Sequence, residues 1–374
     1  MKISSVKLYF YILFFSIAFI IVGNRIALMG TNVPHEERKS IIRPVIVTQI
    51  IDTHTIDSSI TFITFSGRTI VGESRGITIT AQQTVSEHAF FTERRAVEVD
   101  DWVLLFYDSF GERYVFMNYM RIHYIAILSA VFLFLIVLFG RTRGFNAIVS
   151  LGLTCAAMFW VFVPAILSGH NIYITTFVIC VYIIISSLLI SIGFNKKAFA
   201  AILGCLGGVF LSGLLMIFMD DVLNLTGFAD EEASFLLMQT HFSISDLRSI
   251  TFAGVTIGAV GAIMDVAMSI SSSLWEICNV DKKFNSVKLF RSGLNIGKDI
   301  LGTMLNTLIL AYIGSSISFI LLVNLQATSM MALLNAEIVI IEILRSLIGS
   351  FGMFLTIPLT AAICSWLYGI REKY

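Results

Sequence analysis

The stretch AGVTIGAVGAIMDVAMSISSSLWEI, residues 253–277, decides the fold class of this chain. It is mostly apolar and exceeds the roughly 20 residues that a helix needs to cross a bilayer. Its small and ionisable residues recur at helical spacing, so they fall on one narrow stripe: Gly254, Gly258, Gly261, Asp265, Ser269, Ser272 and Glu276. A carboxylate such as Asp265 inside an apolar span costs roughly 2.5–3.5 kcal/mol on insertion scales. We therefore expect protein groups to compensate it.

The composition of the whole chain also indicates an integral membrane protein. Of its 374 residues, 57% are hydrophobic and 13% are charged, and the mean hydropathy is +0.87. Soluble domains carry about 25% charged residues. This composition predicts the lipid bilayer as a partner. The net charge is zero and gives no indication of nucleic acid, which we do not expect as a partner. The five cysteines form no CxxC or Cys/His cluster, which argues against a zinc site or a disulfide framework, and we expect no cofactor.

The apolar runs predict a polytopic bundle of about eight spans. Residues 1–28 begin with lysines and read as a first span or signal anchor. The other spans are expected at about 123–140, 147–167, 173–193, 198–219, 250–272, 298–322 and 347–368, within a membrane domain of residues 122–374. The segment 333–347 is too polar to face lipid, so we expect it to be amphipathic at the outer interface or re-entrant.

Residues 30–121 differ from the rest of the chain. Short β-branched runs alternate with polar residues, for example ITFITF at 60–65 and ITIT at 77–80, and glycines separate them. This pattern predicts a small β-rich domain, barrel-like in the manner of an OB fold.

Basic residues orient the predicted spans. Those at 2, 7, 141, 143, 196, 197, 282, 283, 288, 291, 298, 371 and 373 all fall on one side, and the acidic connector 220–232 falls on the other. By the positive-inside rule, we expect a bacterial plasma-membrane protein with both termini cytoplasmic and residues 30–121 extracytoplasmic.

A second polar stripe lies across the cytoplasmic loop from the first and contains Asn295, Asp299, Gly302 and Asn306. Asp265 and Asn306 should both lie about 10 Å deep. We therefore predict an ion or polar-solute site, suited to protons or hard cations with the metal left open, from Asp265, Asn306, Asp299, Ser269 and Glu276.

Purely structural interpretations stay open for these residues. Asp265 can be a structural residue inside the bundle, held by Ser269 or Asn306, and Glu276 and Asp299 can be solvated helix ends. Gly254, Gly258 and Gly261 are expected to be close-packing surfaces. Glu342 and Arg345, three residues apart, are expected to form a charged pair.

Three stretches resemble the YibE/F family of bacterial multi-pass membrane proteins: GAIMDVAMSISSSLWEI, SGLNIGKDILGTMLNTLILAYIGSS and NAEIVIIEILRSLIGSFGMFLTIPLTA. The resemblance runs through most of the chain after about residue 120. It implies a membrane protein and carries over no catalytic residues. It highlights Asp265, Glu276, Asn295, Asp299, Asn306, Glu337, Glu342 and Arg345.

No Walker A, GxSxG or HExxH motif is present, so we do not expect an enzyme. The leading hypothesis is a transporter or permease for an ion or small polar solute. The alternative is a non-transporting membrane component whose β domain recruits or senses a partner. A second membrane protein of the same family or a second copy of the chain is the protein partner we consider.

Overall fold

The structure is a computed structural model that describes residues 5–29, 42–57, 60–71, 75–86, 95–108, 111, 113–228, 235–238, 243–280, 285–326 and 329–369. The chain divides into two compact units. A barrel unit covers Pro34–Leu138, and a helical unit covers Met1–Val33 and Phe139–Tyr374. The first boundary lies near the change of pattern at residue 30, whereas the second falls inside the first apolar run after residue 121.

The barrel unit contains five strands that close on themselves in the order β1-β2-β3-β5-β4. They are β1 (Ile42–Asp57), β2 (Ile60–Thr69), β3 (Thr78–Ser86), β4 (Trp102–Asp108) and β5 (Arg113–Tyr119). All neighbours are antiparallel except β3 and β5, whose short parallel pairing closes the barrel. The predicted β-rich domain is therefore confirmed as a five-stranded barrel, the architecture of OB folds.

The barrel core follows from strand alternation. Inward positions hold Val45, Val47, Phe65, Val103 and Leu105, each with 0% of its surface exposed, while the residues between them face outward. The sequence analysis did not identify β5, because RYVFMNY lacks a clean alternation of inward and outward residues.

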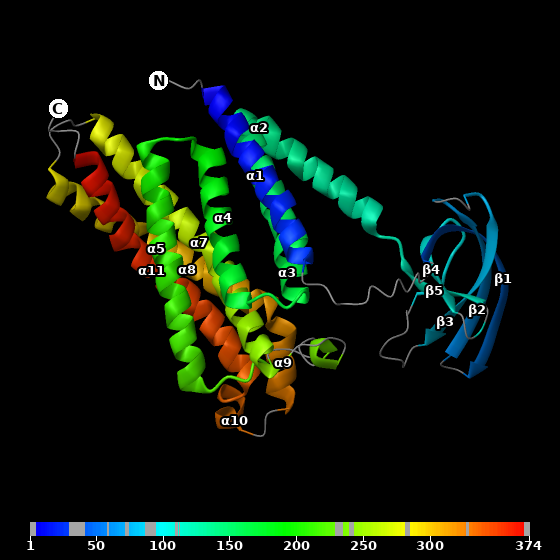
Figure 1. Cartoon of the computed structure of the whole chain (residues 1–374). Coiled ribbons are helices and arrows are strands. Elements are labelled where there is room, and N and C mark those ends of the chain that lie inside the picture. The colour runs from blue at the N-terminus through cyan, green and yellow to red at the C-terminus, as the bar shows by residue number, and fades with distance from the viewer. Residues whose placement is uncertain are drawn as a thin grey trace. The chain divides into compact units, whose positions relative to one another are not determined.

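The remaining described elements are helices (Figure 1). All belong to the helical unit except the start of α2, which belongs to the barrel unit. The helices are α1 (Ser5–Leu28), α2 (Ile122–Ala157), the π-helical turn η1 (Met158–Phe162), α3 (Val163–Leu167), α4 (Ile172–Ile192), α5 (Lys196–Leu223), α7 (Ile244–Val280), α8 (Ser286–Ser315), α9 (Ile317–Gln326), α10 (Met330–Leu334) and α11 (Glu337–Gly369).

Among the described residues, seven helices are long and apolar enough to cross a membrane, where eight spans were predicted. The difference lies between Ile122 and Leu167, where the predicted spans 123–140 and 147–167 merge into one 46-residue helical run. Arg141, with a φ of 47°, is a break inside it. At about 1.5 Å per residue, 46 residues reach about 69 Å, more than twice the ~30 Å hydrocarbon core. Two crossings in this segment remain a prediction.

The predicted amphipathic or re-entrant segment at 333–347 overlaps the start of α11, which runs without interruption from Glu337 to Gly369. The place of this segment relative to the membrane stays a prediction. The polar residues of the overlap lie in the first turns of α11. They form hydrogen bonds and an ion pair with other protein groups there, which is how a membrane helix accommodates them.

Helix α11, red in Figure 1, packs against α5, α7 and α8. Small residues permit the close approach. A Cβ added at Gly204 or Gly208 of α5 would clash with Thr360 or Thr356 of α11, and one at Gly297 of α8 would clash with Ile357. Small residues at helix contacts are typical of membrane bundles, where backbones pack closely.

Candidate intramembrane site

The ion pair predicted between Glu342 and Arg345 forms on α11. The Arg345 guanidinium donates a hydrogen bond of 2.7 Å to Glu342 Oε1. The two side chains are 21% and 26% exposed, so both charges are largely removed from their surroundings. Helical spacing of three residues places them on one face. Charges inside a membrane span pair in this way because an isolated one is expensive.

Each member of the pair keeps a polar atom without a partner. Glu342 Oε2 and Arg345 Nε are buried, and neither makes a hydrogen bond to any residue in the described part of the chain. A buried unpaired acceptor or donor costs about 1–3 kcal/mol, more when the group is charged. The pair therefore has one acceptor and one donor available for a further polar group.

A small cavity lies beside this pair, between the end of α8, the start of α9 and α11. It encloses about 260 Å³ and is walled mainly by isoleucine, valine and leucine side chains. Its polar lining consists of Tyr312, Ser316, Glu342 and Ser346. Apolar walls with a few convergent polar groups are typical of small-molecule sites. The cavity is large enough for water molecules or a small solute.

Tyr312 connects the cavity to helix α7. Its hydroxyl lies 3.0 Å from the point where a Cβ of Gly258 would be, and 3.9 Å from the corresponding point at Gly349 of α11. It also lies within electrostatic range of Glu342 and Arg345. A larger side chain at position 258 would therefore press on the hydroxyl. Sequence analysis missed Tyr312, because a lone tyrosine in an apolar span carries no signal of its contacts.

Asp265 lies further along the same side of α7. Helices α7 and α8 run antiparallel, and Gly258 is opposite Tyr312. Seven residues on, Asp265 is therefore level with Leu305, one residue from Asn306 and about 10 Å from Tyr312 along the helices. The expectation that Asp265 and Asn306 share a depth agrees with this register.

Asp265 and Asn306 are both exposed. Asp265 makes no hydrogen bond or ion pair within the described ranges, although the buried Cys205 thiol of α5 lies within its electrostatic range. No hydrogen bond joins Asp265 to Ser269 or Asn306 within the described residues, and a purely structural role of Asp265 stays a prediction. Glu276 and Asp299 are exposed as well, and Ser269 is half-buried. In the described residues no three His, Cys, Asp or Glu side chains gather closely enough to hold a metal.

Two of the three glycines predicted to pack do not pack within this chain. A Cβ at Gly254 or Gly261 would meet open space, and only Gly258 has a neighbour, the Tyr312 hydroxyl. The spacing of these glycines was interpreted as a packing surface because glycines at such intervals usually form one. The glycines that do pack closely lie on α5 and α8, where they contact α11.

Two further sets of polar contacts join helices and loops near the start of α7 and the start of α11. Arg248 of α7 donates to Asp220 Oδ2 at 2.6 Å and to Asp221 Oδ1 at 3.1 Å. Glu337, at the start of α11, accepts from the backbone N–H of Thr226 at 2.6 Å and of Gly227 at 2.8 Å. Because every one of these groups bonds to another part of the bundle, we interpret them as structural ties.

The barrel unit has a polar cavity of its own, of about 250 Å³. Arg95 lines it, pairs with Asp101 at 3.0 Å and lies over the Tyr119 ring at 5.1 Å. The Asp101 carboxylate raises the pKa of the Arg95 guanidinium above its ordinary value. Trp102 and His123 lie on the same wall with ring centroids 5.2 Å apart. An arginine with aromatic rings is suited to stacking and hydrogen bonding with a polar ligand.

Comparison with known proteins gives one match. The family model described as "YibE/F-like protein" matches residues 128–370, which include α7, α8 and α11. No curated protein and no solved structure matches the chain.

Proposed function

The chain belongs to the YibE/F-like family, and on that premise we propose that it is a membrane permease for an ion or a small polar solute. The observation that carries the proposal is a line of polar residues along the contact of α7, α8 and α11. We call it the polar track and define it as Glu342, Arg345, Tyr312, Asp265 and Asn306.

The polar track covers most of a bilayer's thickness. Arg345 is one turn from Gly349, which is level with Tyr312, and Tyr312 is level with Gly258. Seven residues separate Glu342 from Gly349, and seven separate Gly258 from Asp265. At about 1.5 Å per residue the track reaches about 20 Å, two thirds of the ~30 Å hydrocarbon core. Polar groups at intramembrane depth mark ion and substrate pathways more often than they mark lipid contact.

The exposure of Asp265 and Asn306 adds a requirement to this proposal. Hydrocarbon does not solvate a carboxylate or an amide, so another protein surface must cover this face in the membrane. We propose that a second copy of the chain, or another membrane protein of the same family, completes the pathway there. Crosslinking of a Gly302→Cys variant, at an exposed position of α8 with open space around it, tests this. Failure to crosslink to any protein in native membranes would refute the shared pathway.

Flux through purified protein tests the permease itself. Full-length protein is reconstituted in vesicles, and movement of H⁺, Na⁺, K⁺ and Mg²⁺ is followed with enclosed indicator dyes under an imposed membrane potential. We expect flux of at least one of these ions in the wild type and its loss in Asp265→Asn and in Glu342→Gln. A charge swap, Glu342→Arg with Arg345→Glu, restores the pair and should leave flux impaired. Wild-type flux in all three variants would refute the polar track as the pathway.

The barrel cavity favours the alternative function, recruitment of an extracytoplasmic partner. Deletion of residues 35–115 separates the two proposals. A permease should keep its flux in vesicles without this domain, whereas a recruiting protein should lose its phenotype in intact cells. Wild-type phenotype after the deletion would refute the alternative.

A further inference from the structure

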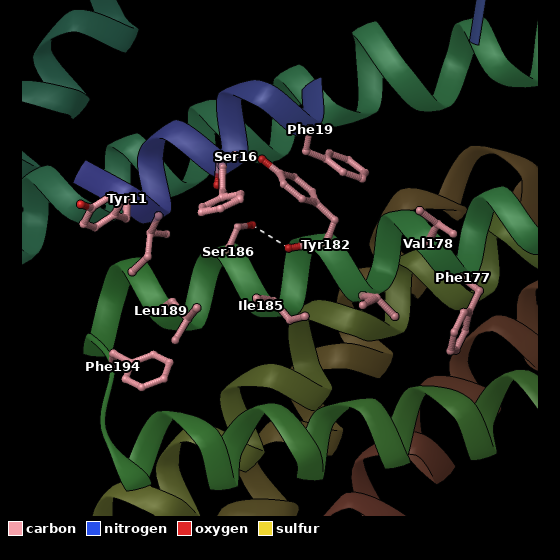
Figure 2. A pocket seen from close by; sticks show the side chains of 13 residues that line it. Tyr11, Ser16, Phe19, Phe177, Val178, Tyr182, Ile185, Ser186, Leu189 and Phe194 are labelled. Carbon is pink, nitrogen blue, oxygen red and sulfur yellow. Dashed lines mark hydrogen bonds between the residues drawn. The ribbon is translucent and has the colours of Figure 1, made fainter. Parts of the chain in front are cut away.

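A long apolar groove lies between α1 and α4, on helices that the polar track does not use (Figure 2). It has a volume of about 670 Å³, within the roughly 300–1,000 Å³ of known ligand pockets. Phe19 of α1 stacks on Tyr182 of α4 with ring centroids 4.2 Å apart. The only polar side chains of the lining are hydroxyls, and that of Ser186 donates to the Tyr182 carbonyl at 2.7 Å. The occupant of this groove must therefore be apolar.

The length of the groove corresponds to one leaflet of a bilayer. Along α4 its lining extends from Phe177 to Leu189, about 18 Å at 1.5 Å per residue. Half of the ~30 Å hydrocarbon core is about 15 Å. Both walls are helices long and apolar enough to span a membrane. A single extended hydrocarbon chain therefore fits the groove in length.

Positive charge lies at one end of the groove. Phe194 lines this end, and Lys196 and Lys197 follow it at the start of α5. Lys196 is exposed and Lys197 half-buried. The Ser271 hydroxyl of α7 donates to the Lys197 carbonyl at 2.7 Å, which holds this backbone in place. Lysines at a membrane surface attract anionic headgroups.

We propose that this groove is a binding site for one anionic phospholipid. An acyl chain lies in the groove between α1 and α4, and the headgroup phosphate lies between Lys196 and Lys197. Apolar complementarity explains why a lipid chain binds, and the two lysines select for negative charge on the headgroup. The site concerns α1 and α4 and is independent of the proposed transport pathway.

Filling the groove tests the position of the acyl chain. Ile185 lines the groove and is 38% exposed, so Ile185→Trp fills it without entering the core. Ile217 of α5, 42% exposed and outside the lining, gives the matched control Ile217→Trp. Full-length protein in detergent is titrated with phosphatidylglycerol, and bound lipid is counted by native mass spectrometry. We expect Ile185→Trp to weaken the first binding event at least tenfold and the control to leave it unchanged.

Removing the charge tests the headgroup. Lys196→Gln with Lys197→Gln should lower phosphatidylglycerol affinity roughly tenfold or more, to that of phosphatidylcholine. Lys288→Gln with Arg291→Gln, on exposed positions of α8, is the matched control and should not change it. Equal affinity of the wild type for the two lipids, or wild-type binding by Ile185→Trp, would overturn the proposal. So would a dimer that dissociates in Ile185→Trp, since the groove would then bind a second copy.

Discussion

Removing one member of the Glu342–Arg345 pair is expected to destabilise the protein more than removing both. Breaking a buried ion pair typically costs 3–5 kcal/mol, because the remaining charge is buried alone. Here the side chains are 21% and 26% exposed, so the lower end of that range applies. Arginine does not lose its proton in proteins, whereas a carboxylate can accept one and become neutral. Glu342→Leu should therefore cost about 3 kcal/mol and Arg345→Met about half as much.

The double variant Glu342→Leu with Arg345→Met replaces both charges by apolar side chains of similar size. Such replacements of ion pairs are often close to neutral, so we expect it to cost no more than about 1.5 kcal/mol. The two single-variant costs together then exceed the double-variant cost by about 3 kcal/mol. This coupling free energy is at the upper end of values for residues in contact. Unfolding of purified full-length protein in mixed micelles, titrated with sodium dodecyl sulfate and followed by circular dichroism, measures each variant. Phe354→Leu, an exposed apolar position of α11, is the control. Single-variant costs that add within about 0.5 kcal/mol would show that the pair does not act as a unit.

Three further outcomes are expected. Gly297→Leu should cost at least about 2 kcal/mol by overpacking against Ile357. By contrast, Gly302→Leu, in open space on the same helix, should keep or slightly raise stability; equal effects in the micelle titration would contradict this. Asp265→Asn and Asp265→Leu should both keep wild-type stability, because no hydrogen bond is lost, and both should lose flux in vesicles. Gln83→Leu should cost about 2 kcal/mol by leaving the Val97 N–H unpaired and removing one of the two donors to the Arg95 carbonyl, which keeps the Tyr119 hydroxyl. Hydrogen exchange at Val97 measures this, and unchanged protection would contradict it.

The barrel shows how much of the fold the local residue pattern predicts. Strands β1 to β4 follow from short β-branched runs, because alternation of inward and outward residues is a local property. Gly67 illustrates the limit. It follows the run at 60–65 and was expected to separate that run from the next, yet it lies within β2, where its missing side chain makes room for Val45 of β1. The cross-strand neighbour that decides its role is 22 residues away in the chain.

The candidate site shows the same division. The sequence by itself determined the membrane class, most span positions and the Glu342–Arg345 pair, because hydropathy and helical spacing depend only on neighbouring residues. Tertiary structure alone decided that Asp265 is exposed and that Tyr312 meets Gly258. It also decided that the packing glycines are those of α5 and α8, not those at 254 and 261. Periodicity places a residue on one face of a helix, but only the arrangement of the other helices determines whether that face meets protein or is left open.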